Sequence, residues 1–173
     1  MAKLPILQYP HPILLQKAEP ITRFNEELAQ LAQDMAETMY ASEGVGLAAN
    51  QVGILKRIVT IDVTQDPKEL HVLINPVIIE RSEECSIHEE GCLSLKGLFE
   101  NVQRSNTVTV RAQNLKGERF TLHAEGLLAI CIQHELDHLD GHVFIDHLSM
   151  MKKNRAIQKL QKIRRNEKKE TQE

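Results

Sequence analysis

His134-Glu135-Leu136-Asp137-His138 lies near the end of a helical apolar pattern that runs over residues 125–139. Counting back from His134 by three, four and seven positions reaches an apolar residue each time, namely Cys131, Ile130 and Leu127. The two histidines therefore continue the buried stripe of this helix. Gly141 is a natural stop signal just beyond it. We expect this helix at the centre of the fold.

The segments upstream of this helix carry strand patterns that are joined by turns. Strands are predicted over residues 57–63, 72–79, 108–112 and 120–123, with a hairpin turn at residues 114–117. Asn25 can cap a helix that runs to about Ser42, and a last helix is predicted over roughly residues 149–165. Because strands follow strands without alternating helices, the expected class is α+β, with mainly antiparallel β-sheets around the central HExxH helix and a C-terminal helix.

The composition is typical of one globular domain. The chain has 173 residues, of which 42% are hydrophobic and 26% charged, and its net charge is −3. It has no Trp and only two Tyr and four Phe, which argues against a surface that stacks nucleic-acid bases. We expect residues 1–149 to form a catalytic body and residues 150–173 a basic C-terminal helix and tail of the same domain.

Cysteine usage and hydropathy favour the cytoplasm. The three cysteines are an odd set without Cys-x-x-Cys spacing, so a disulfide framework is not expected. Prolines at positions 5, 10 and 12 interrupt the apolar N-terminal residues. No apolar run approaches the ~20 residues that a membrane-spanning helix needs. We therefore expect a cytoplasmic protein with no membrane contact.

The spacing of the two histidines favours a metal site. Imidazoles four residues apart lie on one helix face, where they suit neighbouring corners of a tetrahedral site. Glu135 would stand beside the ion without binding it and could accept a proton from water. The HExxH pattern also occurs by chance, and the alternative is a pair of core histidines bonded to backbone carbonyls.

A catalytic metal site needs a third protein ligand and one position open to water. The extended protease pattern HExxHxxGxxH would require a histidine at position 144, which is Phe144. A distant glutamate would have to come from the charged tail, which offers Glu167, Glu170 and Glu173. Cys92, in Glu90-Gly91-Cys92-Leu93-Ser94, is the better candidate, because a thiolate is a strong ligand for zinc or ferrous iron. Cys85 and Cys131 are expected to be small buried hydrophobes instead.

Three motifs together resemble the signature motifs of the peptide deformylase family. They are Gly-Val-Gly-Leu-Ala-Ala-Asn-Gln at residues 44–51, Glu-Gly-Cys-Leu-Ser at 90–94 and Gln-His-Glu-Leu-Asp-His at 133–138. They stand in the family's order and at similar separations, and the resemblance covers about residues 7–149. The family removes the formyl group from the initiator methionine of new polypeptides. The resemblance thus implies a metal-dependent amide hydrolase whose substrate is an N-formyl-methionyl nascent peptide.

The resemblance also implies chemical roles. Cys92, His134 and His138 are expected to hold one divalent ion, Fe²⁺ in many members, with Zn²⁺, Ni²⁺ or Co²⁺ able to substitute. Glu135 would move a proton from water to the departing amine. The side-chain amide of Gln51 and the backbone N–H of Leu93 would donate hydrogen bonds to the formyl oxygen.

A peptide substrate is expected to lie extended against the edge formed by Val45 and Gly46. The residues expected to contact it are Gly44, Val45, Gly46, His88, Gly91, Leu127, Ile130 and Cys131. Behind Cys92, Glu90 is expected to pair with Arg104. The chain departs from the family pattern at Lys96, where proline is common, and at His88, where an apolar residue is common.

Two other functions are compatible with the motifs. One is a general HExxH metallopeptidase, against which the lack of a histidine at position 144 argues. The other is a non-catalytic, deformylase-like binding protein, against which the intact Gln51, Cys92 and Glu135 argue. A monomer is expected in each case.

Charge is distributed unevenly along the chain. From Lys152 to the end there are nine Lys or Arg and three Glu, which gives this segment a net charge of +6. Because the whole chain has a net charge of −3, the rest of the chain has a net charge of −9. Such a basic helix is usually a solvated face. The resemblance adds a second interpretation, in which the helix docks on ribosomal RNA through phosphate contacts.

Overall fold

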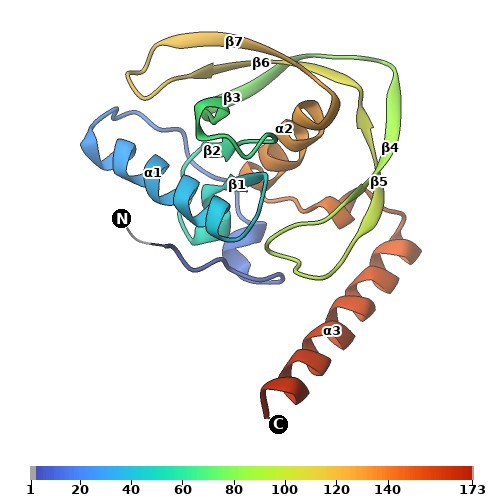
Figure 1. Ribbon diagram of the computed structural model, residues 1–173. Coiled ribbons are helices and arrows are strands. Elements are labelled where there is room, and N and C mark those ends of the chain that lie inside the picture. Colours follow the sequence, from blue (N-terminus) through green and yellow to red (C-terminus); the bar gives the residue numbers. More distant parts are fainter. Residues whose placement is uncertain (1–2, 173) are drawn as a thin grey trace.

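A computed structural model of the chain describes residues 3–172, so Glu173, which was considered as a distant ligand, lies outside the described residues. The central element is helix α2 (Gly126–Leu139). Figure 1 shows strands arching over α2, helix α1 (Glu26–Ala41) beside it, and helix α3 (Met150–Gln172) projecting from the body. The described residues also form four short 3-10 helices, η1 (Pro12–Leu15), η2 (Ala49–Val52), η3 (Pro67–Glu69) and η4 (Phe144–His147).

The strands form two sheets. The five-stranded sheet has the order β1-β2-β3-β6-β7 and the second sheet pairs β4 with β5. Within residues 3–172, all neighbouring strands of both sheets are antiparallel. The α+β class with antiparallel sheets around the HExxH helix is therefore confirmed. The strands are β1 (Gly46–Ala48), β2 (Ile58–Ile61), β3 (His71–Arg81), β4 (Cys85–Glu90), β5 (Glu100–Ser105), β6 (Thr107–Gln113) and β7 (Arg119–Glu125).

The first two long helices lie almost where the sequence predicts them. Asn25 caps α1, since its side-chain oxygen accepts a hydrogen bond from the backbone N–H of Leu28 at 3.1 Å. Helix α2 ends at Leu139, and Gly141 follows it with a left-handed φ of 82°. The histidine face of α2 is buried, as expected: His134 is 7% exposed and His138 is 0% exposed.

Three strands, β1, β4 and β5, lie outside the ranges predicted from the sequence. Strand β1 has only three residues, too few for a periodic pattern. Strand β4 is mostly exposed and buries only Glu90, so it lacks the alternation of apolar and polar residues that marks a half-buried strand. Cys85 at its start is exposed, so the prediction that this cysteine is buried was wrong.

Three hydrophobic clusters fill the body. The first lies between α2 and the five-stranded sheet and includes Ile132 and Leu136. The second packs α1 against β1 and β2, around Met35 and Met39. The third joins the loop after β4 to η4 and α3, around Phe144.

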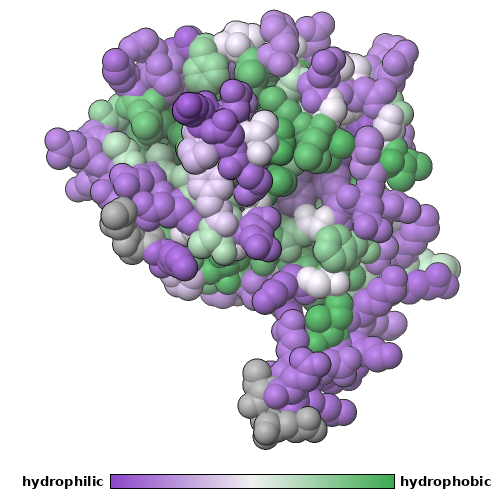
Figure 2. All heavy atoms as spheres, in the orientation of Figure 1, coloured by the Kyte–Doolittle hydropathy of each residue, from purple (hydrophilic) through white to green (hydrophobic). Residues whose placement is uncertain are grey.

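Helix α3 begins near the predicted residue 149. It ends at Gln172, about two turns beyond the predicted end at residue 165. Ala156 and Leu160 are buried in the third cluster, which fixes the proximal half of the helix to the body. The distal half is exposed and charged, and Figure 2 shows the projecting part of the helix as mostly hydrophilic. None of the helices formed by residues 3–172 has the length and apolar character needed to cross a membrane.

Gly141 is expected to be sensitive to substitution. A Cβ at this position would lie 2.7 Å from the backbone oxygen of Leu15, which cannot move away as a flexible side chain could. We expect Gly141→Ala to lower the free energy of unfolding, measured by denaturant titration, by about 3 kcal/mol through the clash and the left-handed φ together.

Gly126 supplies the control for this prediction. It also has a positive φ, +61°, but nothing lies within 4 Å of its added Cβ. Gly126→Ala should therefore lower the free energy of unfolding by only about 1 kcal/mol, because only the left-handed backbone conformation is unfavourable for alanine. Equal losses in the two variants would show that the contact with Leu15 has no effect.

Candidate active site

Three potential metal ligands converge at one end of the chain's central helix. Cys92 lies in the loop that follows β4, and His134 and His138 lie one turn apart on α2. One donor atom from each, a sulfur and two ring nitrogens, can be chosen so that all lie within 4.8 Å of one another. Cys92 Sγ is 3.3 Å from His138 Nε2, and the two imidazole rings are 5.0 Å apart.

The chemistry and orientation of these donors fit a divalent metal ion. One thiolate with two imidazoles is a donor set that zinc and ferrous iron accept. The Nδ1–H of His134 donates to Glu90 Oε1 at 2.8 Å, which leaves Nε2 of the same ring available as a ligand. The three side chains could therefore bind one metal ion, each through a single donor atom.

Glu135 places a carboxylate next to the three donors. Glu135 is 4% exposed, and its Oε1 lies 3.9 Å from His134 Nε2. Its Oε2 is buried and has no hydrogen-bond partner in the described structure. Burial raises the pKa of Glu135 to about 7, with the nearby His134 acting in the opposite direction.

Gly46 makes room for this carboxylate. A Cβ on Gly46 would lie 2.9 Å from Glu135 Oε1 and 3.0 Å from its Cγ. From the sequence, this glycine was expected only to allow the close approach of a peptide. The structure adds a second reason, since the β1 backbone packs directly on the Glu135 side chain.

Gln51 turns its amide nitrogen toward the same site. The backbone N–H of Ala48 donates to Gln51 Oε1 at 2.9 Å, which fixes the orientation of the amide. Gln51 Nε2 then lies 3.5 Å from Cys92 Sγ and 3.1 Å from Ser94 Oγ. Gln51 is 1% exposed, so its amide is a preorganised donor beside the sulfur.

The N-terminal segment holds the two loops of the site side by side. The backbone N–H of Leu7 donates to the carbonyl of Gln51 at 2.7 Å, and that of Tyr9 donates to the carbonyl of Ser94 at 2.8 Å. Between them, Gln8 Nε2 donates to the Leu93 carbonyl at 2.8 Å. Residues 7–9 thus fix Leu93 and Gln51 relative to each other.

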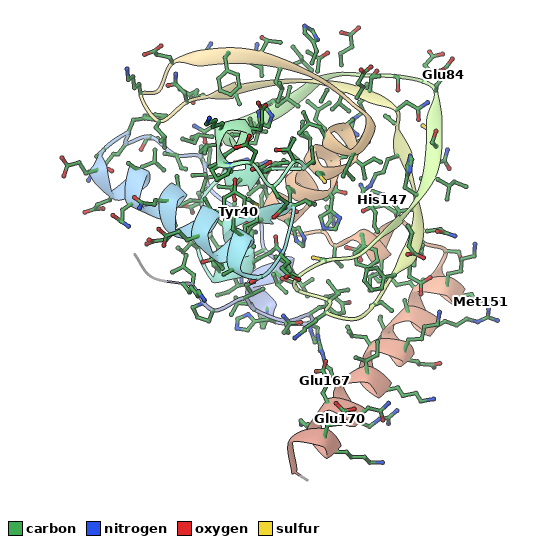
Figure 3. The ribbon with its side chains drawn as sticks, in the orientation of Figure 1. Tyr40, Glu84, His147, Met151, Glu167 and Glu170 are labelled. Atoms are coloured by element: carbon green, nitrogen blue, oxygen red, sulfur yellow. The ribbon has the colours of Figure 1, made fainter. Side chains whose placement is uncertain are left out.

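A turn after β2 fixes the loop that carries Gly44 and Val45. The Asp62 N–H donates to the Val45 carbonyl at 2.8 Å, and Gln65 Nε2 donates to the Gly44 carbonyl at 3.1 Å. The Asp62 carboxylate is buried and accepts a hydrogen bond from the hydroxyl of Tyr40, which Figure 3 labels near the end of α1. These contacts make this edge of the site a rigid surface.

A buried ionic network lies behind the three potential metal ligands. The guanidinium of Arg104 binds both oxygens of Glu90, at 2.7 and 2.9 Å, as the resemblance suggested. Its third contact, at 2.7 Å, is with Asp137 Oδ2. Burial alone would raise the pKa values of Glu90 and Asp137, but the hydrogen bonds that they accept outweigh it and lower both to about 2. Glu90 accepts from Arg104 and His134, and Asp137 accepts from His147 and Arg104.

A cleft of about 830 Å³ opens in front of these groups. Cys92, His134 and Glu135 form part of its wall, whereas Gln51 and His138 lie buried behind it. Burial raises the pKa of the Cys131 thiol in this wall to about 12, so that thiol is neutral. The residues predicted to contact the substrate all line the cleft, as does the predicted donor Leu93. The predicted contacts are Gly44, Val45, Gly46, His88, Gly91, Leu127, Ile130 and Cys131.

The chain matches the family described as polypeptide deformylase over residues 3–154. It is 52% identical to a peptide deformylase of Neisseria meningitidis serogroup B over 162 residues, which cover 94% of this chain and 96% of the relative. It is 48% identical to peptide deformylase 1 of Burkholderia multivorans, with 95% and 91% covered. This chain belongs to the polypeptide deformylase family. Deformylases are metalloenzymes that remove the N-formyl group from nascent polypeptides, and the prediction of such a hydrolase is confirmed.

Solved deformylase structures share the fold. A crystal structure of a peptide deformylase from Legionella pneumophila superposes with a TM-score of 0.91 at 43% identity, covering 96% of this chain and 98% of that one. The deformylase from Thermotoga maritima gives a TM-score of 0.82 at 40% identity, with 86% and 99% covered. Each of the three signature motifs lies within residues 3–154, which match the family, and all three contribute residues to the site.

The deformylase cleft also contains residues that the sequence analysis did not assign. Ile6 and Gln8 enter it from the N-terminal segment and Glu43 from the end of α1. Phe99 is 58% exposed, and its ring covers Gly91, where a Cβ would lie 2.5 Å from Phe99 Cε1. None of these residues belongs to a motif, and the aromatic character of Phe99 was the only signal that could have singled it out.

Proposed function

We propose that this chain hydrolyses the formyl amide bond of N-formyl-methionyl peptides, using the side chains that converge on the cleft. The observation that carries the proposal is the Glu135 carboxylate, which is buried, has one oxygen without a partner and stands beside three convergent metal donors. A buried carboxylate of this kind is unfavourable for stability, which is the usual mark of a functional group.

Cys92, His134 and His138 are proposed to hold one divalent ion, with Fe²⁺ as the physiological metal and Zn²⁺, Ni²⁺ or Co²⁺ as substitutes. A thiolate and two imidazoles suit these ions better than they suit Mg²⁺ or Ca²⁺, which prefer oxygen. When bound, the ion would supply a Lewis acid that polarises the formyl group and makes water more acidic.

The proton is proposed to move through Glu135. Its carboxylate would accept a proton from the attacking water and deliver it to the amide nitrogen as the carbon–nitrogen bond breaks, giving formate and a free amine. Gln51 Nε2 and the Leu93 N–H would donate hydrogen bonds to the formyl oxygen as negative charge develops there. The contacts of Gln51 with Ala48 and of Leu93 with Gln8 support this role, because they orient both donors before substrate arrives.

The substrate is proposed to bind in extended form along residues 44–46, with Gly91 on the facing wall. Strand β1 is an edge strand of its sheet and has main-chain groups on its open side. The methionine side chain would enter the pocket made by Val45, His88, Leu127, Ile130 and Cys131. Leu127 lines this cleft and is 52% exposed. Such an exposed apolar side chain favours the binding of an apolar ligand group.

Formate release tests the proposal. Protein loaded with Fe²⁺ without oxygen should release formate from an N-formyl-methionyl tripeptide and leave the N-acetyl analogue intact, because a methyl crowds the reacting carbon. Cleavage of unformylated peptides would favour the general metallopeptidase. Metal binding without formate release would favour the non-catalytic binding protein.

We also propose that the distal half of α3 docks on the ribosome, and that the protein acts as a cytoplasmic monomer. Lys162, Arg165 and Lys169 line one basic surface of the helix. A deletion from Lys152 onward would be a poor test, because it removes Ala156 and Leu160 from the third cluster.

Charge reversal avoids this problem. Changing Lys162, Arg165 and Lys169 to glutamate should weaken ribosome binding at low salt more than about tenfold, through lost phosphate contacts, and leave hydrolysis of a short peptide unchanged. Lys116→Glu, in the exposed β6–β7 turn, is the control. Unchanged ribosome binding by the triple variant in a sedimentation assay would exclude this surface.

A further inference from the structure

His147, the last residue of η4, lies at the outer end of the ionic network. Its side chain is 42% exposed, and Nε2 lies 2.7 Å from Asp137 Oδ2 and 3.2 Å from Arg104 Nη1. A carboxylate can only accept, so the short contact with Asp137 requires a hydrogen on Nε2. Arg104 and His147 therefore donate to the same oxygen of Asp137. Figure 3 labels His147 close to α2 and β5.

The network continues from Asp137 to a metal ligand without a gap. Arg104 connects the Asp137 carboxylate to Glu90, and Glu90 Oε1 accepts the Nδ1–H of His134. Each link is a charge-assisted contact of 2.7 to 2.9 Å. A half-exposed imidazole is thereby joined to the ring that is proposed to bind the ion.

We propose that His147 is a positioning residue for the metal centre. By donating to Asp137 Oδ2, it keeps that carboxylate turned toward the guanidinium of Arg104. The guanidinium is 3% exposed and has carboxylates on two sides, so a rotation of Asp137 leaves Nη1 without its partner and loosens the hold on Glu90. Glu90 sets the ring orientation of His134, and the effect reaches the ligand through it.

Water could not do what the His147 side chain does in this network. Asp137 is 24% exposed at its side chain, so water would take the place of the imidazole if the imidazole were removed. Water satisfies the oxygen but is not attached to η4 and does not fix a rotamer. Loss of outer partners of a metal ligand typically lowers metal affinity by about 10- to 100-fold. His147 acts through three other side chains, so the lower end of this range is expected.

Two substitutions separate the donated hydrogen from the bulk of the side chain. In His147→Gln the side-chain Nε2 keeps an N–H donor at nearly the same reach, whereas His147→Leu removes it. His142→Leu is the matched control, because His142 lies just before η4, is 62% exposed at its side chain, and contacts Asp146 rather than the network.

The measurement is the dissociation constant of Co²⁺ by chelator competition, together with the visible ligand-field spectrum of the Co²⁺ protein. His147→Leu should bind Co²⁺ about tenfold more weakly and show shifted bands, whereas His147→Gln and His142→Leu should match the unchanged protein. Denaturant unfolding of the metal-free proteins shows whether the leucine variant is folded.

The inference rests on the metal site proposed above, and its failure is distinguishable from the failure of that site. If the unchanged protein binds no Co²⁺, the metal site itself is wrong. If it binds Co²⁺ and His147→Leu is identical to it, His147 has no positioning role. An equal loss in His147→Gln and His147→Leu would also overturn the inference, because the donated hydrogen would then be irrelevant.

Discussion

Replacing Glu135 with glutamine is expected to slow formate release by about 10²–10⁴-fold, while the protein keeps its metal. Glutamine has nearly the same size, so packing against Gly46 is preserved. It cannot take up a proton from water and pass it to the amine. The metal should stay because the proposed ligands are Cys92, His134 and His138, and not Glu135.

The measurement combines steady-state formate release with metal content determined on the same sample. Glu125→Gln is a suitable control, since Glu125 precedes α2, is exposed and makes no side-chain capping bond. Full activity in Glu135→Gln would contradict the proton role. Loss of the metal in that variant would mean that Glu135 takes part in binding it.

The second large effect is expected in the buried ionic network. Replacing Arg104 with methionine should lower the free energy of unfolding by about 3–5 kcal/mol, because the Glu90 and Asp137 carboxylates lose their common partner. The side chains of Arg104 and Glu90 are 3% and 5% exposed, so water cannot readily take over the contacts. Denaturant unfolding of the metal-free protein measures the change.

Arg111→Met is the control for this variant, because Arg111 is exposed on β6 and such surface changes usually stay within about 0.5 kcal/mol. Arg104→Lys should be intermediate, since an ammonium keeps the charge but cannot bind Glu90 through two parallel bonds. A stability of Arg104→Met equal to that of the control would mean that the network contributes nothing net to folding.

Local signals explain which parts of the fold were predictable. The cap at Asn25, the apolar stripe of α2 and the glycine after it define the helices, because each acts over a few neighbouring residues. Strand β4 was missed because it is largely exposed, and β5 because one of its two buried residues is the charged Arg104. Neither strand therefore shows an alternation of apolar and polar residues. The length of α3 was underestimated because its distal half is helical without an apolar face.

The candidate site also has features that the sequence could predict and features that it could not. The helix spacing pointed to the two histidines, and the family resemblance supplied Gln51 and supported Cys92, which are 42 or more residues away from them along the chain. The supporting contacts could not be foreseen: the contact of Gln8 with Leu93 spans 85 positions and that of Arg104 with Glu90 depends on how β5 pairs with β4. Such contacts are products of the tertiary fold and leave no local pattern.

The proposed ligands come from segments that pack on two different hydrophobic clusters, and this has a consequence for the stability of the chain. Cys92 packs on the third cluster, while α2 with its histidines belongs to the first. All three cysteines are free, so no covalent cross-link joins these regions. An ion held by the sulfur and the imidazoles would close the chain segment from residue 92 to residue 134 as a disulfide would, restricting the unfolded state and coupling the stability of separate clusters to the supply of metal.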